Sequence, residues 1–237
     1  MSVRGRLAAV VLAAALPVPA AESAPPGAFQ GWVPPGWKLL RTASGDLDGD
    51  GRADAVLVLE KDDPANRKPN ASLGAPEINL NPRRLLVLFA GERGWREGPR
   101  TDRFLPTEGY LENPCQLDPL VDGDVKVVRG TLRIDLHYWL SCGSYGVAHN
   151  TFTFRLEGGR LRLIGLDTLQ FMRNSGESSR DSVNFLTGRA KSTTGDNMFE
   201  PSSPRVQWRR VDHRVPIYLD EMSSECLVDG KPQRWCR

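Results

Sequence analysis

Hydrophobic residues follow two patterns along this chain, and both are patterns of β-strands. Residues 55–60 and 84–90 are apolar runs too short for a typical helix, which indicates buried strands. Between residues 132 and 139 apolar and polar side chains alternate, and the alternation returns over 151–156. A period of two places successive side chains on opposite faces, so these segments predict half-buried strands.

Turn residues separate the apolar segments at regular intervals. Gly91-Glu92-Arg93-Gly94 and Glu157-Gly158-Gly159-Arg160 are typical of tight connections between antiparallel strands. The expected strands span residues 37–41, 55–60, 84–90, 95–97, 125–128, 132–139, 151–156, 160–167, 181–186, 189–193 and 206–211. Residues 216–222 form either a short helix or an edge strand, and helical periodicity is otherwise nearly absent. The pattern predicts an all-β fold of antiparallel meanders, with blade-like (propeller-like) or sandwich sheets and little helix.

The same pattern suggests how the chain is divided. Residues 21–36 are rich in Pro and Ala and are expected to form an extended entry segment. Residues 37–237 then form a single β domain, either undivided or with two blade-like halves, 37–100 and 124–211, and a disulfide-closed C-terminal tail. Residues 61–82 show little periodicity and predict a long surface excursion, which is either a binding surface or a flexible insertion.

Residues 1–20 have the features of a signal peptide. Arg4 and Arg6 precede an Ala-rich apolar run over residues 7–16, and Val18-Pro19-Ala20 fits a small-residue cleavage site. The apolar run is shorter than the roughly 20 residues of a membrane-spanning helix. We therefore expect export to the periplasm or secretion, with no membrane span.

Removal of residues 1–20 lowers the number of Lys and Arg from 31 to 29, which equals the 29 Asp and Glu. A mature protein with a net charge near zero lacks the general basic field through which nucleic acids are bound. We therefore expect no nucleic-acid partner.

The four cysteines are even in number, which in an exported chain favours two disulfides over a metal site. Three pairings are possible, and we favour Cys226–Cys236 together with Cys115–Cys142. The chain holds no C-x-x-C pair, so the sequence gives little support to a zinc ribbon or a redox motif.

The densest cluster of candidate ligands is the acidic loop, residues 46–54, in which Asp46, Asp48, Asp50 and Asp54 occupy positions 1, 3, 5 and 9. Oxygen ligands at this density suit Ca²⁺, and position 7, Arg52, is expected to give its backbone carbonyl. Gly51 supplies the sharp turn at position 6. Position 12 is Leu57, within an apolar strand, where an EF-hand requires Glu and a helix. The alternative is a solvated acidic turn between two strands.

Because the loop has the form D-x-D-G-D-G-x-x-D and runs into a hydrophobic strand, it resembles the FG-GAP/VCBS calcium loop of β-propeller and integrin-like repeats. It is also similar to a group of small secreted bacterial proteins that carry one such loop and have no assigned function. The resemblance covers residues 44–60 and implies that Asp46, Asp48, Asp50 and Asp54 are the ligands. This chain holds one loop where propellers hold several, which argues against a full propeller.

These features predict an exported calcium-binding β module with a structural or binding role at the cell envelope, whose partner is a protein or glycan. We do not expect an enzyme. The competing hypothesis is an exported hydrolase that uses Asp135, His137 and Ser141 or Ser144, since Asp135 and His137 share one strand face. The other histidines are His149 and His213, and no spaced catalytic motif accompanies them.

A third hypothesis concerns the loop over residues 141–146, Ser-Cys-Gly-Ser-Tyr-Gly. It is loosely similar to the Ser/Gly/Tyr loops of periplasmic lysozyme inhibitors, which would make Tyr145 a contact residue. The simpler interpretation is that Gly143 and Gly146 permit a tight bend while Cys142 forms a disulfide.

Overall fold

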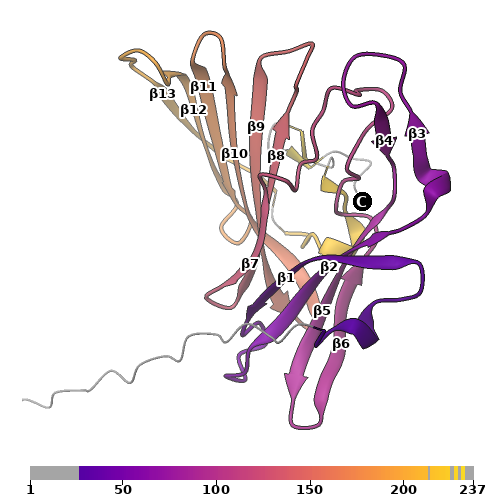
Figure 1. Ribbon diagram of the computed structural model, residues 1–237. Helices are drawn as coiled ribbons and strands as arrows, with labels where there is room; N and C mark the ends of the chain where they lie inside the picture. Colours follow the sequence, from indigo (N-terminus) through magenta and orange to yellow (C-terminus); the bar gives the residue numbers. More distant parts are fainter. Residues whose placement is uncertain (1–26, 213, 225–226, 229–230, 233–237) are drawn as a thin grey trace, which may run out of the picture.

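The computed structural model describes residues 27–212, 214–224, 227–228 and 231–232 (Figure 1). The predicted signal peptide, His213 and the predicted Cys226–Cys236 bridge lie outside these residues. Nearly all of the described secondary structure is β-strand, and every strand pairing is antiparallel, which confirms the predicted all-β class.

Two large sheets make up most of the fold. The four-stranded sheet has the order β1-β2-β5-β6, and the seven-stranded sheet runs as a continuous meander from β13 to β7. The first contains β1 (Trp37–Gly45), β2 (Asp54–Lys61), β5 (Arg83–Gly91) and β6 (Gly94–Thr101). The second contains β7 (Asp124–Val128), β8 (Thr131–Trp139), β9 (Gly146–Glu157), β10 (Arg160–Met172), β11 (Glu177–Asn184), β12 (Arg189–Asn197) and β13 (Arg205–Arg210).

Smaller elements lie outside the two large sheets. The excursion predicted over 61–82 contains a short hairpin of β3 (Arg67–Pro69) and β4 (Glu77–Asn79), preceded by η2 (Pro64–Asn66). For residues 216–222 the sequence predicts either a short helix or an edge strand. This segment contains η3 (Leu219–Glu221), and Tyr218 forms an isolated antiparallel β-bridge with Arg162. The remaining elements are η1 (Gln30–Trp32), β14 (Leu227–Val228) and β15 (Lys231–Pro232).

One hydrophobic core joins the two sheets. Val56 and Val58 of β2 belong to the same buried cluster as Ile134 of β8 and Phe152 of β9. Phe104, in the connection between the sheets, packs edge-to-face against Phe152 at a ring-centroid distance of 5.0 Å. The chain segments 37–101 and 124–210 therefore form separate sheets but share one core.

The opposite face of the four-stranded sheet is covered by the N-terminal segment. Leu57 and Leu59 of β2 pack there with Phe29, and Trp32 and Trp37 pack partly buried against this second cluster. Both faces of β2 are thus buried, and this explains why its sequence is apolar without alternation.

A buried polar network attaches the excursion to the end of this sheet. The side chains of Glu60 and Arg83 are 1% and 2% exposed, and Arg83 Nε donates to Glu60 Oε2 at 2.9 Å. Arg83 also makes two hydrogen bonds to the carboxylate of Asp118, at 2.6 and 2.7 Å. Asn79 in β4 donates to Glu60 Oε1 at 3.1 Å, so the excursion is held by hydrogen bonds as well as by its hairpin.

Candidate metal centre

The acidic loop, residues 46–54, begins where the β1–β2 ladder ends at the pair Gly45 and Asp54. Gly49 and Gly51 have φ angles of +82° and +85°, a region that residues with a Cβ rarely adopt. Gly45 lies so close to β7 that a Cβ there would be 2.7 Å from the Val127 side chain. Glycine at these positions lets the loop coil tightly and lie against the neighbouring sheet.

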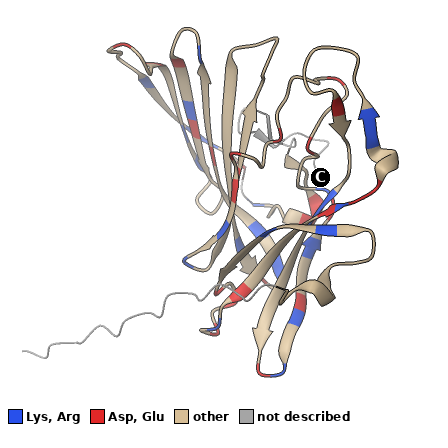
Figure 2. Ribbon diagram, in the orientation of Figure 1, with Lys and Arg blue, Asp and Glu red and all other residues tan. Residues whose placement is uncertain are grey.

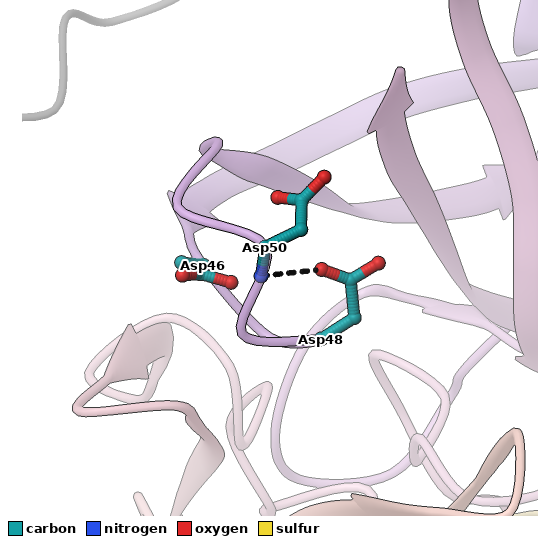
Figure 3. A group of neighbouring side chains, drawn as sticks. All are labelled: Asp46, Asp48 and Asp50. Atoms are coloured by element: carbon teal, nitrogen blue, oxygen red, sulfur yellow. Dashed lines mark hydrogen bonds between the residues drawn. The ribbon is translucent and has the colours of Figure 1, made fainter.

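Backbone N–H groups of the loop are bound by its own carboxylates. Asp46 accepts hydrogen bonds from Gly49 N at 2.7 Å and from Gly51 N at 2.9 Å. Asp48 accepts from Asp50 N at 3.2 Å (Figure 3). These contacts bend the loop so that its first three acidic side chains lie close together.

One carboxylate oxygen from each of Asp46, Asp48 and Asp50 lies within 4.8 Å of the others. Figure 3 shows the three side chains around one turn of the loop. Asp46 is half-buried, and the other two are exposed. Three carboxylates at this spacing repel one another, and a hard cation with oxygen ligands would relieve that repulsion.

Asp54 lies apart from this group. It is fully buried, and its Oδ2 accepts from Leu47 N at 2.8 Å while its Oδ1 accepts from Ala90 N at 3.0 Å. Burial raises the pKa of this carboxyl group, although the hydrogen bonds from Ala90 and Leu47 act in the opposite direction. The predicted ligand at position 9 thus connects the loop to β5 through the backbone.

Arg52 provides a positive charge beside the acidic side chains. Its guanidinium lies 3.2 Å from Asp50 Oδ2 and 3.7 Å from Glu92 Oε1. The Arg52 side chain is about half exposed, so this ion pair is weak in water. A metal ion could therefore replace the guanidinium at the Asp50 carboxylate. The backbone carbonyl of Arg52 remains the predicted ligand at position 7.

The residues of the hydrolase hypothesis make other contacts. His137 Nδ1 lies 3.3 Å from Asp122, and its ring stacks on that of His149 at a centroid distance of 4.0 Å. Asp135 lies 3.0 Å from Lys126 Nζ and accepts a hydrogen bond from Thr151. Ser141 donates to the Cys115 carbonyl at 2.9 Å, and Ser144 Oγ accepts from Gly146 N at 3.0 Å. In this part of the chain, neither hydroxyl forms a hydrogen bond to His137 that would begin a catalytic triad.

The disulfide Cys115–Cys142 is present, as predicted, with 5.2 Å between the Cα atoms. It joins the loop between β8 and β9 to the connection between the two sheets. Tyr145 of this loop is 58% exposed and is therefore accessible to a partner. The inhibitor hypothesis stays a prediction.

Sequence reasoning missed a cavity at this end of the seven-stranded sheet, whose walls include Tyr138, Gln170 and Ser179. A signal was available in β10, where alternation assigns Gln170 to the same face as the core residue Leu166. A polar residue at a core-facing position indicates that the core ends before that point.

Comparisons with protein families, with curated proteins and with solved structures find no match for this chain. Among the described residues, no helix has the length and apolar character needed to cross a membrane. Lys and Arg are interspersed with Asp and Glu over both sheets (Figure 2).

Proposed function

We propose that the protein is an exported β module that binds Ca²⁺ in its acidic loop, and that the ion stabilises the attachment of the loop to the two sheets. The observation that carries this proposal is the convergence of Asp46, Asp48 and Asp50, with one oxygen of each within 4.8 Å of the others. The ion would act structurally, at the cell envelope, where calcium is available at high concentration.

Two contacts explain how an ion in the loop would affect the whole fold. Leu47, between the first two acidic residues, is only 5% exposed and belongs to the shared core. Asp54 connects the other end of the loop to Ala90 at the end of β5. An ion that fixes the carboxylates would therefore restrain two segments that belong to the core.

The test is a thermal melt of the mature protein, with its disulfides intact, in excess EDTA and then in about 10 mM Ca²⁺. Extracellular calcium modules bind with Kd on the order of 10⁻⁴–10⁻³ M. Such affinity would add roughly 1.4–2.7 kcal/mol to the free energy of unfolding. For a domain of this size we expect Tm to rise by roughly 3–11 °C.

Asp50→Ala should abolish the rise, because it removes one of the three convergent carboxylates. Asp167→Ala is the matched control, since Asp167 is an exposed carboxylate on β10, outside the loop. Mg²⁺ should shift Tm less than Ca²⁺, because it demands a stricter octahedral geometry. Equal Tm values with and without Ca²⁺, together with no heat of binding in calorimetry, would show that the loop is an acidic turn only.

A further inference from the structure

A cavity of about 500 Å³ lies on the core-facing side of the seven-stranded sheet, beyond the last core residues. Small-molecule sites typically have volumes of roughly 300–1,000 Å³. Its floor is formed by residues of β8 to β11. The pairing register places Tyr138, Ala148, Gln170 and Ser179 in one row and pairs Gly146 with Met172 in the next, and Leu140 and Glu177 also line the cavity.

One edge of the cavity, beside the antiparallel bridge between Gln116 and Leu140, comes from the connection between the sheets. Asn113 and Gln116 line it, and between them Cys115 is bonded to Cys142 in the β8–β9 loop. Leu117 N donates to the Trp139 carbonyl at 2.9 Å, and Ser141 N donates to the Cys115 carbonyl at 2.8 Å. This edge is therefore fixed to residues 139–142 by a covalent bond and by two backbone hydrogen bonds.

Arg173 holds the remaining wall. Its guanidinium donates to the carbonyls of Leu140 and Ser144, at 2.8 and 2.9 Å, and lies 3.8 Å from the centre of the Trp139 ring. These contacts stabilise both ends of the 140–144 segment, which forms one side of the cavity. A wall restrained in this way loses little conformational entropy when a ligand binds.

Most of the lining is uncharged, and it combines hydrogen-bonding groups with apolar surface. The polar side chains are mostly amides and hydroxyls, which can donate and accept: Asn113, Gln116, Gln170, Ser144 and Ser179. Tyr138, Leu140 and Met172 give apolar surface. Glu177 is the one charged residue among the described residues that line the cavity, so a negatively charged ligand would be repelled.

Gln116 has an unused hydrogen-bonding group. Its side-chain nitrogen is covered by neighbouring residues and has no hydrogen-bond partner in the described part of the chain. A buried N–H group without a partner is unfavourable, and a ligand oxygen would satisfy it once the side chain turns toward the cavity.

From these observations we propose that the cavity binds a short neutral saccharide. A sugar ring has hydroxyl groups that both donate and accept, which matches the amides and hydroxyls of the lining. Its C–H face matches the apolar surface of Tyr138, Leu140 and Met172. The Ser141–Gly146 loop, singled out by its sequence, then serves as a rigid wall of a sugar site.

This site is separate from the proposed calcium site. The turn at Gly130, before the first residue of β8, lies beside Asp46, whereas the cavity lies at the other end of the strand, at Tyr138 and Leu140. The two proposals therefore depend on different residues and can fail independently.

The test is a titration of the full mature protein, monitored by backbone amide NMR, with maltose, cellobiose and the β1,4-linked dimer of N-acetylglucosamine. We expect at least one of these probes, at millimolar concentration, to shift the signals of residues 113–117, 138–148 and 170–179. Gln170→Ala should weaken binding about tenfold, because it removes an exposed hydrogen-bonding group from the floor. Gln207→Ala on β13, which changes another exposed glutamine outside the cavity, should bind as the unsubstituted protein does.

A second pair of variants tests the location without removing a polar group. Ala148→Phe fills the floor and should abolish binding, whereas Ser182→Phe places the same ring on the exterior face of the sheet and should leave it unchanged. The amide spectrum of each variant shows directly whether it is folded. The proposal is overturned if none of the three saccharides shifts these signals, or if octanoate, an apolar anion, binds the cavity and the saccharides do not.

Discussion

The two sheets differ in how much of their surface the rest of the protein covers. In the four-stranded sheet, the central strands β2 and β5 are buried on both faces, by the shared core and by the N-terminal segment. In the seven-stranded sheet, only one face contacts the core, and only over part of its length. In Figure 1 the strands β9–β13 extend well beyond the four-stranded sheet.

This difference separates the regions that stabilise the fold from the regions available for binding. Continuous burial gives β2 and β5 their apolar runs, and the acidic loop leads into β2. The uncovered end of the seven-stranded sheet has polar side chains on both faces, and there the cavity is found. A strand that extends past the core thus supplies binding surface at little cost to stability.

The largest expected effect is in the buried polar network at the end of the four-stranded sheet. Arg83→Met removes the cation that pairs with Asp118 and leaves Glu60 with Lys38 alone, and removal of one partner from a buried ion pair typically costs about 3–5 kcal/mol. The neighbouring Arg84 is the matched control, because it pairs with Asp102, whose side chain is 46% exposed. Arg84→Met should cost less than about 1 kcal/mol. Urea denaturation of both variants measures the difference, and equal losses would contradict the role given to burial.

Leucine substitutions should have a smaller effect on the free energy of unfolding, and the effect should differ between the two sheets. Leu57 in β2 is fully buried, so Leu57→Ala should lower the free energy of unfolding by about 2–4 kcal/mol. Leu169 lies on the exterior face of β10, beyond the shared core, and is only partly buried. Leu169→Ala should cost less than about 1 kcal/mol, because little apolar surface is lost there. Comparable values from urea denaturation would show that the end of the seven-stranded sheet is as tightly packed as the four-stranded sheet.

The smallest effect is a pH dependence on the exterior face of the seven-stranded sheet. Burial lowers the pKa of His149 and the charge of His137 lowers it further, while Asp122 and Asp135 act in the opposite direction. Because the folded state holds this proton more weakly than the unfolded state, stability should decrease as the pH falls through about 6.5. His149→Gln should reduce the difference in unfolding free energy between pH 8 and pH 5. An unchanged difference would show that other groups cause the pH dependence in that range.

Prediction from sequence succeeded where local physical chemistry decides the outcome. The strands over 132–139 and 151–156 followed from alternation, because one face of each must be apolar to pack on the core. The hairpin turn at Gly158-Gly159 followed from conformational freedom, and both glycines have positive φ angles, +59° and +80°. The close approach of Asp46, Asp48 and Asp50 followed from their spacing in a short loop.

Prediction was weaker where distant residues meet. Asp54 belongs to the acidic loop by spacing, yet its Oδ1 binds Ala90, 36 residues away. The excursion over 61–82 shows little periodicity, and its attachment could not be predicted because it depends on Arg83, Glu60 and Asp118, which come together only in the folded chain.

The sequence by itself determined the all-β class, the order of most strands and the acidic loop. These depend on short-range patterns, in which each residue restricts its close neighbours along the chain. For the four cysteines the sequence left three pairings, and the structure selects the Cys115–Cys142 bridge. Only the tertiary structure decided how the two sheets share a core and where that core ends. It also decided that Asn113 and Gln116 come together with Tyr138 and Gln170 to line one cavity. Such contacts depend on the packing of many side chains at once, and no local pattern in the sequence specifies them.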